Sequence, residues 1–590
     1  MKNKLISFKT IFTLVLKEKP ILIFGQIITL IAILISIPIP LMLPIMVDEV
    51  LLSKPDKIVH TINNIFGTGD ALYYIAIVTL TVITLRFIHF ILLAVITKVF
   101  TKISKNVTFD IRKKLLTHLQ NVSMNEYESL GSGSISANLV TDINTLDNFI
   151  ITSTSKFVSS SLTLIAISIV MIYIDTTLGL LILIIQPIIM VLSKKISSKV
   201  TKLKKDENQA IEDFQNNIGE TLDLFGQIKS SNKESYFFHK SINLANRIKT
   251  ASNEYSFKSV AYERFSYTLF LIMFEVLRAS GLLLVAYSDL SIGMMFAMFG
   301  YIWFIIAPLQ DILSMQYSYA SAKAALDRIN KILYLKKESN GKEILNSNQD
   351  IDINIQNLCF SYNKNKQILK NISLNIKAKQ HIALIGSSGS GKTTLAQIIA
   401  GFYEKDSGLL CYNNIKIENI NKQSLRQNIF LVLQMPILFN QTLRFNLTMG
   451  DTNITDDKIF DALQIAQLKT TIQNMPDGLD TIVGHHGIRL SGGQRQRISI
   501  ARMIIANPRV IIFDESTSAL DVHTEYKLFK ELEKFLKDKT VITIAHRLST
   551  VKNANNIYVL ENGEIVESGT HEELEFNDGH YNQFVKNQLR

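Results

Sequence analysis

A glycine-rich segment in the second half of the chain has the residue types and spacing to bind phosphates. It follows the apolar run His381–Ile385, which predicts a buried strand, and precedes the helical pattern Leu395–Gly401. Glycines let backbone N–H groups curl around phosphates, and the N-terminus of the following helix favours negative charge. We expect its lysine to reach the terminal phosphates of ATP and the next threonine to place its hydroxyl on Mg²⁺. The segment comprises Gly386, Ser387, Ser388, Gly389, Ser390, Gly391, Lys392, Thr393 and Thr394.

Two carboxylates follow a second apolar run, Val510–Phe513. Asp514 and Glu515 would stand at the carboxyl end of a strand, where a parallel sheet places ligand-binding groups. Asp514 is suited to holding Mg²⁺, and Glu515 to activating the attacking water as a general base. On its own such a pair is more often an ordinary strand end, but the phosphate-binding segment upstream favours the catalytic interpretation.

Short apolar strands alternating with helical patterns must position these groups. This alternation predicts an α/β P-loop NTPase domain over residues 351–590, preceded by a polar linker at 336–350. The 590 residues are too many for one ordinary domain, and the long apolar runs lie before about Pro308. We therefore expect a second, all-helical membrane domain over residues 1–335.

Composition narrows the class of protein further. The net charge of +11 could indicate nucleic-acid binding, but many lysines lie between the hydrophobic runs, where they would meet anionic membrane lipids. We expect no nucleic-acid partner. The only two cysteines, Cys359 and Cys411, provide neither a disulfide framework nor a zinc site.

Six apolar runs are long enough to cross a membrane as helices, which takes about 20 residues each. The third and fourth runs, and the fifth and sixth, are joined by only a few residues, so each pair should be a tight hairpin. The runs are Ile21–Val47, Ala71–Phe100, Phe157–Tyr173, Leu178–Leu192, Phe265–Tyr287 and Ile292–Ile312.

Lysine and arginine placement predicts the orientation. The connection from Lys194 to Lys258 carries twelve of these residues and the two hairpins carry none, so both termini and both long connections should be cytoplasmic. The connections are polar yet helically patterned, which predicts membrane helices that continue into the cytoplasm. Each contains a turn-like segment, Gly131–Ser134 and Gly219–Gly226, that could contact a soluble domain.

Some ionisable residues lie inside the predicted spans, where charge is costly. Arg86 and His89 in the second span, and Glu275 and Arg278 in the fifth, are candidates for lining a cavity or a gate. The alternative is an ion pair that only fixes packing, or side chains that reach the interface from near a span end.

The segment Leu490–Gln494 resembles the signature of the ABC ATPases. It stands twenty residues before Asp514, which matches the family spacing, although the same residues could simply cap a helix. The resemblance implies that this segment binds ATP across a dimer interface. The residues it would use are Ser491, Gly492, Gly493 and Gln494.

Other segments are similar to further motifs of the same family. The resemblance implies that Tyr362 stacks on adenine and that Gln434 senses the γ-phosphate and joins the Mg²⁺ ligands. It also implies that Ser518–Asp521 crosses between paired ATPase domains, and that His546 is the switch histidine on the γ-phosphate.

The membrane half resembles the exporter branch of the family, which has six spans followed by one ATPase domain. Tyr127–Asp142 and Gln215–Glu234 are similar to its two coupling regions. One departure is His485, where exporters commonly have an acidic residue. A histidine there could make the contact with the coupling regions pH-sensitive, or it could fill a tolerant surface position.

The resemblance implies a homodimer with two ATP molecules, although a heterodimer is also compatible. It implies ATP-driven export of an amphipathic substrate, such as a lipid or lipid-linked sugar, a drug or a peptide, across the cell (inner) membrane. An ATP-gated membrane regulator or channel is the alternative, since its ATPase motifs would be the same. A soluble ATPase acting on nucleic acid is inconsistent with six spans.

Overall fold

The computed structural model describes residues 5–52, 57–288, 290–362, 366–484, 487–515, 520–545, 548–577 and 579–589. It contains two compact units. Unit 1 comprises Met1–Leu119 and Gly133–Tyr334, and unit 2 comprises Gln120–Ser132 and Leu335–Arg590. Each unit has its own hydrophobic core, so they are described separately.

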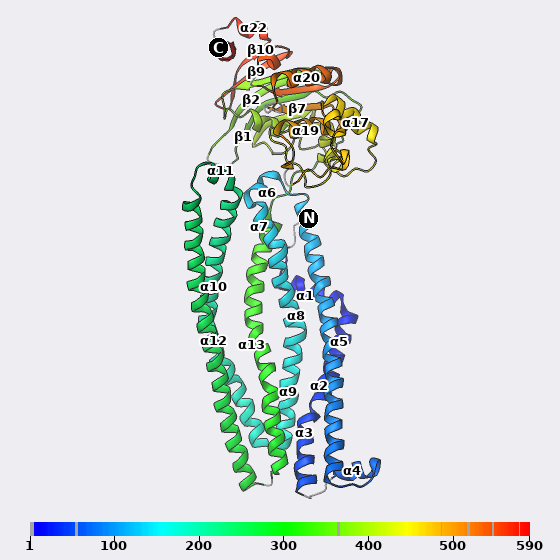
Figure 1. Ribbon diagram of the computed structural model, residues 1–590, viewed down its shortest axis with the longest axis vertical. Coiled ribbons are helices and arrows are strands. Elements are labelled where there is room, and N and C mark those ends of the chain that lie inside the picture. The colour runs from blue at the N-terminus through cyan, green and yellow to red at the C-terminus, as the bar shows by residue number, and fades with distance from the viewer. Residues whose placement is uncertain are drawn as a thin grey trace. The chain divides into compact units, whose positions relative to one another are not determined.

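Unit 1 is built from long helices (Figure 1). Five segments in the described part of the chain are long and apolar enough to cross a membrane. The fourth predicted run lies within a further long helix, but the side chains over much of that run are outside the described residues. The five segments are Lys19–Leu51, Ala71–Leu119, Gly133–Ile174, Glu234–Tyr287 and Ile292–Ile312.

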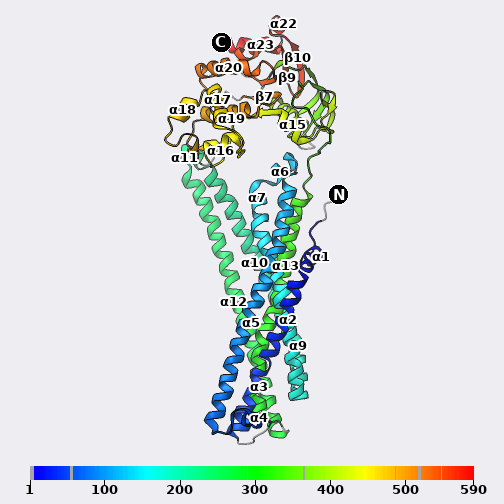
Figure 2. The ribbon, with the colours of Figure 1, turned by 90° about the vertical axis from the view of Figure 1, so that its right-hand side faces the viewer.

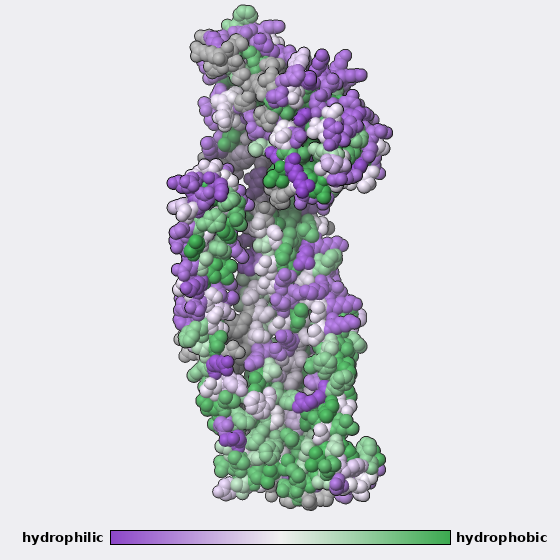
Figure 3. Space-filling view, in the orientation of Figure 1, coloured by the Kyte–Doolittle hydropathy of each residue, from purple (hydrophilic) through white to green (hydrophobic). Residues whose placement is uncertain are grey.

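Four of the helices extend well past a membrane's thickness. They have 43 to 54 residues, whereas about 20 are needed to span the hydrocarbon core. The helices therefore continue beyond their apolar runs, as predicted, and the cytoplasmic location of these continuations stays a prediction. Hydrophobic residues gather near α3 (Pro38–Pro44) and α4 (Lys57–Phe66), and hydrophilic ones toward α11 (Phe225–Ser230), on the face shown in Figure 3. The four helices are α5 (Ala71–Leu119), α10 (Thr176–Asp223), α12 (Glu234–Tyr287) and α13 (Ile292–Tyr334).

The first apolar run does not form one continuous helix. It is divided into α2 (Lys19–Ser36), α3 and the π-helix η1 (Ile45–Leu51), because prolines at 38, 40 and 44 remove backbone donors. The hydroxyl of the fully buried Tyr301 in α13 donates to the carbonyl of Ile37 at the first break. The remaining helices of this part are α1 (Phe8–Lys17), α8 (Ile143–Ile151), η2 (Asn138–Asp142), η3 (Thr152–Lys156) and α9 (Phe157–Ile174).

The two arms of the second long connection, α10 and α12, run side by side (Figures 1 and 2). Helix α10 ends at Asp223 and α11 begins at Phe225, within the segment predicted to turn. Gly131, in the other predicted turn, has φ +76° and separates α6 (Met124–Leu130) from α7 (Ser132–Ala137). Both predicted turns are therefore present.

Unit 2 contains two sheets. The larger has the order β10-β9-β3-β8-β7-β6, and all but its antiparallel edge strand β10 are parallel. The smaller is antiparallel, with the order β2-β1-β4-β5. The strands are β1 (Ile353–Phe360), β2 (Leu369–Ile376), β3 (His381–Gly386), β4 (Ser407–Tyr412), β5 (Ile415–Lys416), β6 (Ile429–Val432), β7 (Val510–Asp514), β8 (Thr540–Ile544), β9 (Asn556–Glu561) and β10 (Glu564–Gly569).

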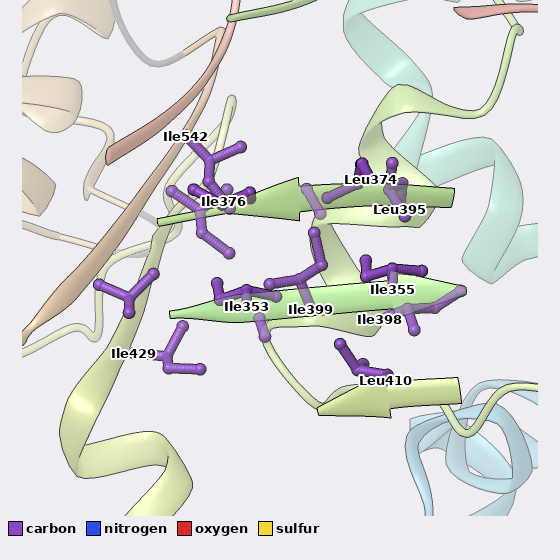
Figure 4. Packing of buried hydrophobic residues seen from close by; sticks show 14 of the residues in the cluster. Ile353, Ile355, Leu374, Ile376, Leu395, Ile398, Ile399, Leu410, Ile429 and Ile542 are labelled. Carbon is purple, nitrogen blue, oxygen red and sulfur yellow. The ribbon is translucent and has the colours of Figure 1, made fainter. Parts of the chain in front are cut away.

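Helix α14 (Lys392–Ile399) packs among these strands (Figure 4). Its apolar residues Leu395, Ile398 and Ile399 are buried in one cluster with side chains from both sheets. A second cluster includes α19 (Gly492–Ala506) and α17 (Asp456–Ile465). The other helices are α15 (Lys422–Asn428), α16 (Leu443–Thr448), α18 (Lys469–Gln473), η4 (Gly478–Asp480), α20 (Val522–Leu536), α21 (Leu548–Val551), α22 (His571–Glu575) and α23 (His580–Leu589).

The short helix α6 belongs to unit 2 although its neighbours in sequence do not. Val122 and Lys337 form an antiparallel bridge, and the N–H of Ser123 donates to the carbonyl of Lys336 at 3.0 Å. The hydroxyl of Tyr403 lies 3.0 and 2.9 Å from the two carboxylate oxygens of Glu128. Helix α6, which overlaps the first predicted coupling region, is thus held in unit 2 by backbone contacts to residues 336–337 and by the side-chain contact between Glu128 and Tyr403.

Candidate nucleotide-binding site

The register of the larger sheet brings the phosphate-binding segment and the two carboxylates to one edge. Strand β3 pairs in parallel with β8, and β8 pairs in parallel with β7. Leu384 and Asp514 both lie opposite Ile544, so the ends of β3 and β7 are level. The segment after Gly386 and the carboxylates of Asp514 and Glu515 therefore meet where a parallel sheet binds ligands.

The glycines of the segment have the backbone conformations that only glycine adopts readily. Gly386, Gly389 and Gly391 have φ of +144°, +80° and +102°. A Cβ on Gly391 would lie 2.7 Å from a methyl carbon of Leu369. The chain can therefore turn tightly between β3 and α14, as a loop that cradles phosphates requires.

Lys392 is buried at the start of α14, with a side chain folded over the loop. Its Nζ donates to the carbonyls of Gly386 and Ser387, at 3.0 and 2.8 Å, and lies 3.4 Å from the hydroxyl of Ser390. Burial lowers the pKa of Lys392, while the nearby charges of Glu515, Glu561 and Asp514 act in the opposite direction. The acceptors named here are neutral oxygens, so a phosphate could give this buried ammonium an anionic hydrogen-bond partner.

Thr393 and Asp514 are in direct contact. The Thr393 hydroxyl donates to Oδ1 of Asp514 at 3.1 Å, and Asp514 is almost fully buried. Within the described residues, no group of three or more His, Cys, Asp or Glu side chains could hold a metal. One hydroxyl and one carboxylate nevertheless fit Mg²⁺, which is usually bound by few protein oxygens together with waters and phosphate oxygens.

Glu515 lies next to Gln434. The Gln434 side-chain amide donates to Oε2 of Glu515 at 2.6 Å, and its backbone carbonyl accepts a 3.1 Å bond from Gln496. Glu515 has φ +44°, an uncommon conformation for a residue with a side chain, and such strain is frequent at functional sites. In this arrangement the Gln434 amide is bound to Glu515.

Tyr362 is tied to the helix that follows the phosphate loop. Its hydroxyl is 3.0 Å from that of Thr394 and 3.3 Å from the side-chain oxygen of Gln397. Its ring packs edge-on against Phe360 and Tyr403, with centroid distances of 4.9 and 5.3 Å. The aromatic ring therefore stands beside the predicted phosphate site, and stacking on adenine stays a prediction.

The predicted signature segment caps α19. The Ser491 hydroxyl accepts a 3.2 Å bond from the N–H of Gln494, whose side chain accepts a 2.8 Å bond from the N–H of Ser491. This reciprocal pair leaves Gly492 and Gly493 in the first turn, where helix N–H groups attract anions. Among the described residues, no hydrogen bond joins Ser491 or Gln494 to the phosphate loop of the same chain.

Several predicted residues lie outside the described part of the chain, namely His546, His485, Ser518 and Ala519. Asp521, the last residue of the predicted crossing segment, is described. Its carboxylate accepts a 2.9 Å bond from the N–H of Thr524 and caps α20.

The ionisable residues of the predicted spans lie on two helices. Glu275 and Arg278 form an ion pair on α12 and are both about half exposed within this chain. Arg86 and His89 lie one helical turn apart on α5. The alternative interpretation of Glu275 and Arg278 was an ion pair, and this ion pair is present. Among the described residues, no ion pair joins the charged groups of α5 to those of α12.

Sequence reasoning missed a polar contact between α9 and α13 in the membrane half. Asp311 of α13 accepts a 3.0 Å hydrogen bond from Ser160 of α9 and lies 4.0 Å from Nζ of Lys156. Asp311 stands near the end of the sixth apolar run and Lys156 directly before the third. A search for opposite charges at matching span ends would have found this pair.

Sequence reasoning also missed Glu561, the last residue of β9. Its carboxylate binds the phosphate loop through the N–H and hydroxyl of Ser387. The sequence contained a signal for this residue, because Glu561 directly follows the apolar run Ile557–Leu560, as Asp514 follows Val510–Phe513.

Family models and relatives both match most of this chain. Residues 369–518 match the family model described as ABC transporter, and residues 22–309 match that described as ABC transporter transmembrane region. A Bacillus subtilis (strain 168) protein named "Putative multidrug export ATP-binding/permease protein YgaD" is 30% identical over 485 residues, covering 80% of this chain and 82% of that protein. A Staphylococcus aureus (strain NCTC 8325 / PS 47) protein with the same description is 32% identical over 488 residues, covering 81% and 83%.

A solved structure has the same fold. It is described as "Structure of a bacterial Atm1-family ABC exporter with ATP bound" and is similar with a TM-score of 0.83 at 22% sequence identity. The similarity covers 97% of this chain and all of that one. The two family matches lie in one chain, in the order of a membrane region followed by an ATPase. The chain therefore belongs to the ABC transporter family, as a multi-pass half-transporter of the exporter type whose ATPase is coupled to transport.

Proposed function

We propose that this chain works as a homodimer that exports an amphipathic substrate across the cell membrane, with each subunit hydrolysing MgATP. The observation that carries the proposal is the 3.1 Å contact between Thr393 and Asp514, which joins the phosphate loop to the end of β7, directly before Glu515. We place the transmembrane domain at residues 1–335, a linker at 336–350 and the ATPase domain at 351–590.

Each polar group at the edge of the sheet has a proposed role. Lys392 binds the terminal phosphates, the loop amides between Ser388 and Thr394 bind the remaining phosphate oxygens, and Tyr362 packs on the adenine. Bound Mg²⁺, held through Thr393 and Asp514, would neutralise charge on the phosphates. Glu515 accepts a proton from the attacking water, and the Gln434 amide orients the Glu515 carboxylate across 2.6 Å.

We propose two subunits because, in the family that this chain belongs to, the signature of one subunit completes the ATP site of the other. In the dimer, the capped N-terminus of α19 would face ATP held by the other subunit. Ser491 and the amides of Gly492 and Gly493 would then bind the γ-phosphate. His546 would contact the same phosphate from within its own subunit.

ATP drives export only if it binds the two arrangements of the membrane domain with different affinity. We propose that closure of the ATPase domains around ATP favours an outward-facing cavity, and that hydrolysis restores the inward-facing one. Lysine and arginine placement supports a cytoplasmic location for both termini, which would put the ATPase domain where ATP is available.

The substrate class is proposed from two observations. The relatives named above carry the description multidrug export. In this chain, Glu275 and Arg278 place both signs of charge among apolar side chains of a predicted span. Such surroundings suit molecules that combine a large apolar part with a charged or zwitterionic group.

The test is the ATPase rate of the purified protein in lipid nanodiscs, measured with lipids, hydrophobic drugs and small peptides, with Glu515→Gln as the blank. Stimulation by one class, together with ATP-dependent movement of that class into or out of proteoliposomes, would support export. A rate that no class changes, combined with ATP-dependent ion leak, would favour the ATP-gated regulator or channel.

A further inference from the structure

Ser387 is the one residue of the phosphate loop whose donors are both bound to a carboxylate. Its N–H donates to Oε1 of Glu561 at 2.8 Å, and its hydroxyl donates to Oε2 at 2.7 Å. Its carbonyl in turn accepts the 2.8 Å bond from Nζ of Lys392. Ser387 is thus held between an anion on one side and the phosphate-binding lysine on the other.

The backbone explains why Glu561 reaches this position. Strand β9 runs parallel to β3, with Leu560 opposite Gly386, so the next residue of each strand is also level. A Cβ on Gly386 would lie only 1.9 Å from the carbonyl oxygen of Leu560. The glycine at the start of the loop therefore permits the close approach that brings Glu561 to Ser387.

Glu561 also stands on a rigid support. Asn562 and Gly563 have φ of +51° and +84° and form a two-residue hairpin, in which Glu561 is paired with Glu564. This turn suits the twist of the flanking strands, and such short hairpins fix the register. A carboxylate held at the end of a paired strand loses little entropy when it forms its hydrogen bonds.

The charge state of Glu561 is compatible with this contact. Partial burial acts to raise the pKa of Glu561, but the hydrogen bonds from Ser387, with the charges of His580 and Lys392, bring it below its ordinary value. The side chain is therefore ionised at neutral pH, and both of its bonds to Ser387 are charge-assisted.

We propose that Glu561 is a positioning residue that holds the first turn of the phosphate loop in its nucleotide-binding shape before ATP arrives. Glu561 would not contact the nucleotide. It lowers the conformational cost of binding, because Ser387 and, through its carbonyl, Lys392 are already in place. The inference adds to the proposed function a residue outside its ATP-binding and catalytic set.

The experiment compares full-length variants in nanodiscs by direct MgATP binding and by steady-state ATPase kinetics. Glu561→Ala should weaken MgATP binding and raise KM roughly tenfold, the loss expected when a charged hydrogen-bonding partner is removed. At saturating ATP, kcat should stay unchanged, since the reacting groups are untouched. Glu561→Gln keeps an acceptor for the Ser387 N–H and should recover most of the affinity.

Two further variants make the test specific. Ser387→Ala removes only the hydroxyl and should cause a smaller loss, and combining it with Glu561→Ala should add nothing to the effect of Glu561→Ala alone. Glu564→Gln changes the opposing residue of the same hairpin and should leave KM unaltered. The thermal unfolding temperature without nucleotide shows whether each variant is folded.

The proposal would be overturned by a fall in kcat at unchanged KM, by additive losses in the double variant, or by an equal effect of Glu564→Gln. A loss of affinity that follows a lowered unfolding temperature and is not recovered by Glu561→Gln would also contradict it. Failure of export is a separate result, because MgATP binding is measured without any transported substrate.

Discussion

Gln434 and Glu515 are joined by a 2.6 Å hydrogen bond from the glutamine amide to Oε2 of the glutamate. Gln434 follows the end of β6 and Glu515 follows β7, and these strands are parallel neighbours in the larger sheet. The bond therefore connects two loops that leave the same edge. The loop with Gln434 also contains the exposed apolar residues Leu433 and Met435, and the loop with Glu515 carries the proposed general base.

Replacing Gln434 tests whether this bond orients the base. Gln434→Ala should lower kcat roughly 10- to 100-fold, since a hydrogen bond to a charged group contributes about 1.5–3 kcal/mol. MgATP affinity should change little, because Lys392 and the loop amides remain. Single-turnover and steady-state ATPase assays check the prediction, with Gln441→Ala as a control on the same connecting segment. A kcat equal to that of the unchanged protein would contradict the orienting role.

Lys392→Ala should abolish most phosphate binding without destabilising the fold. Burial lowers the pKa of Lys392, which means that its charge is held at a cost in the nucleotide-free protein. Removing it should weaken MgATP binding by about tenfold or more, while the unfolding temperature without nucleotide stays the same or rises. Lys416→Ala, on the edge strand β5, is the matched control. Unchanged MgATP affinity in Lys392→Ala would argue against the assignment of the phosphate site.

Tyr403→Phe should loosen α6 while leaving the aromatic packing intact. The lost hydroxyl lies 3.0 and 2.9 Å from the carboxylate oxygens of Glu128, and hydrogen bonds to charged groups contribute about 1.5–3 kcal/mol. Hydrogen–deuterium exchange should increase in residues 120–132.

A matched control for that change is Tyr558→Phe. Its hydroxyl donates to the carbonyl of Asn375 at 3.0 Å in the same unit, without contact to α6. If both variants raised hydrogen–deuterium exchange in residues 120–132 equally, or if neither did, the contact between Glu128 and Tyr403 would not be what holds α6 in place.

Acidic pH should weaken the contact, within unit 2, between Glu404 and the segment that contains Lys336 and Ser339. Partial burial acts to raise the pKa of Glu404, but hydrogen bonds from Ser339 and the charge of Lys336 bring it below its ordinary value. A carboxyl group whose pKa is lower in the folded than in the unfolded protein stabilises the fold when it is ionised. This stabilisation is fully present above the pKa of the unfolded protein, about 4.3, and is lost as the pH falls through the pKa of the folded protein. Glu404→Gln should therefore unfold at a temperature that depends less on pH below about 5. An unchanged pH dependence would show that Glu404 does not contribute.

Local sequence patterns were sufficient for part of this structure. The strand before the phosphate loop, the helix after it and the strand ending in Asp514 were predicted because each is encoded by consecutive residues. The start of α13 at Ile292 also matches the start of the sixth predicted run. Apolar length and turn residues within a few positions determine such elements.

Contacts between distant segments could not be predicted in this way. The bridge between Val122 and Lys337 joins residues more than two hundred positions apart, and the bond from Ser387 to Glu561 depends on the register of two parallel strands. The π-helical segment η1 was missed because neither hydropathy nor helical periodicity distinguishes it from an α-helix. Strand order, which decides these contacts, is set by the packing of the whole unit.

Glu515 is the proposed general base of an ATPase whose closed dimer drives export. The most direct experiment measures three properties of Glu515→Gln in nanodiscs. These are the MgATP occupancy, the rate of ATP hydrolysis, and the distance between labels on the two ATPase domains. We predict retained MgATP binding, a persistently closed pair of ATPase domains and a loss of turnover of roughly 10²- to 10⁴-fold. Hydrolysis at the rate of the unchanged protein would show that Glu515 is not the general base.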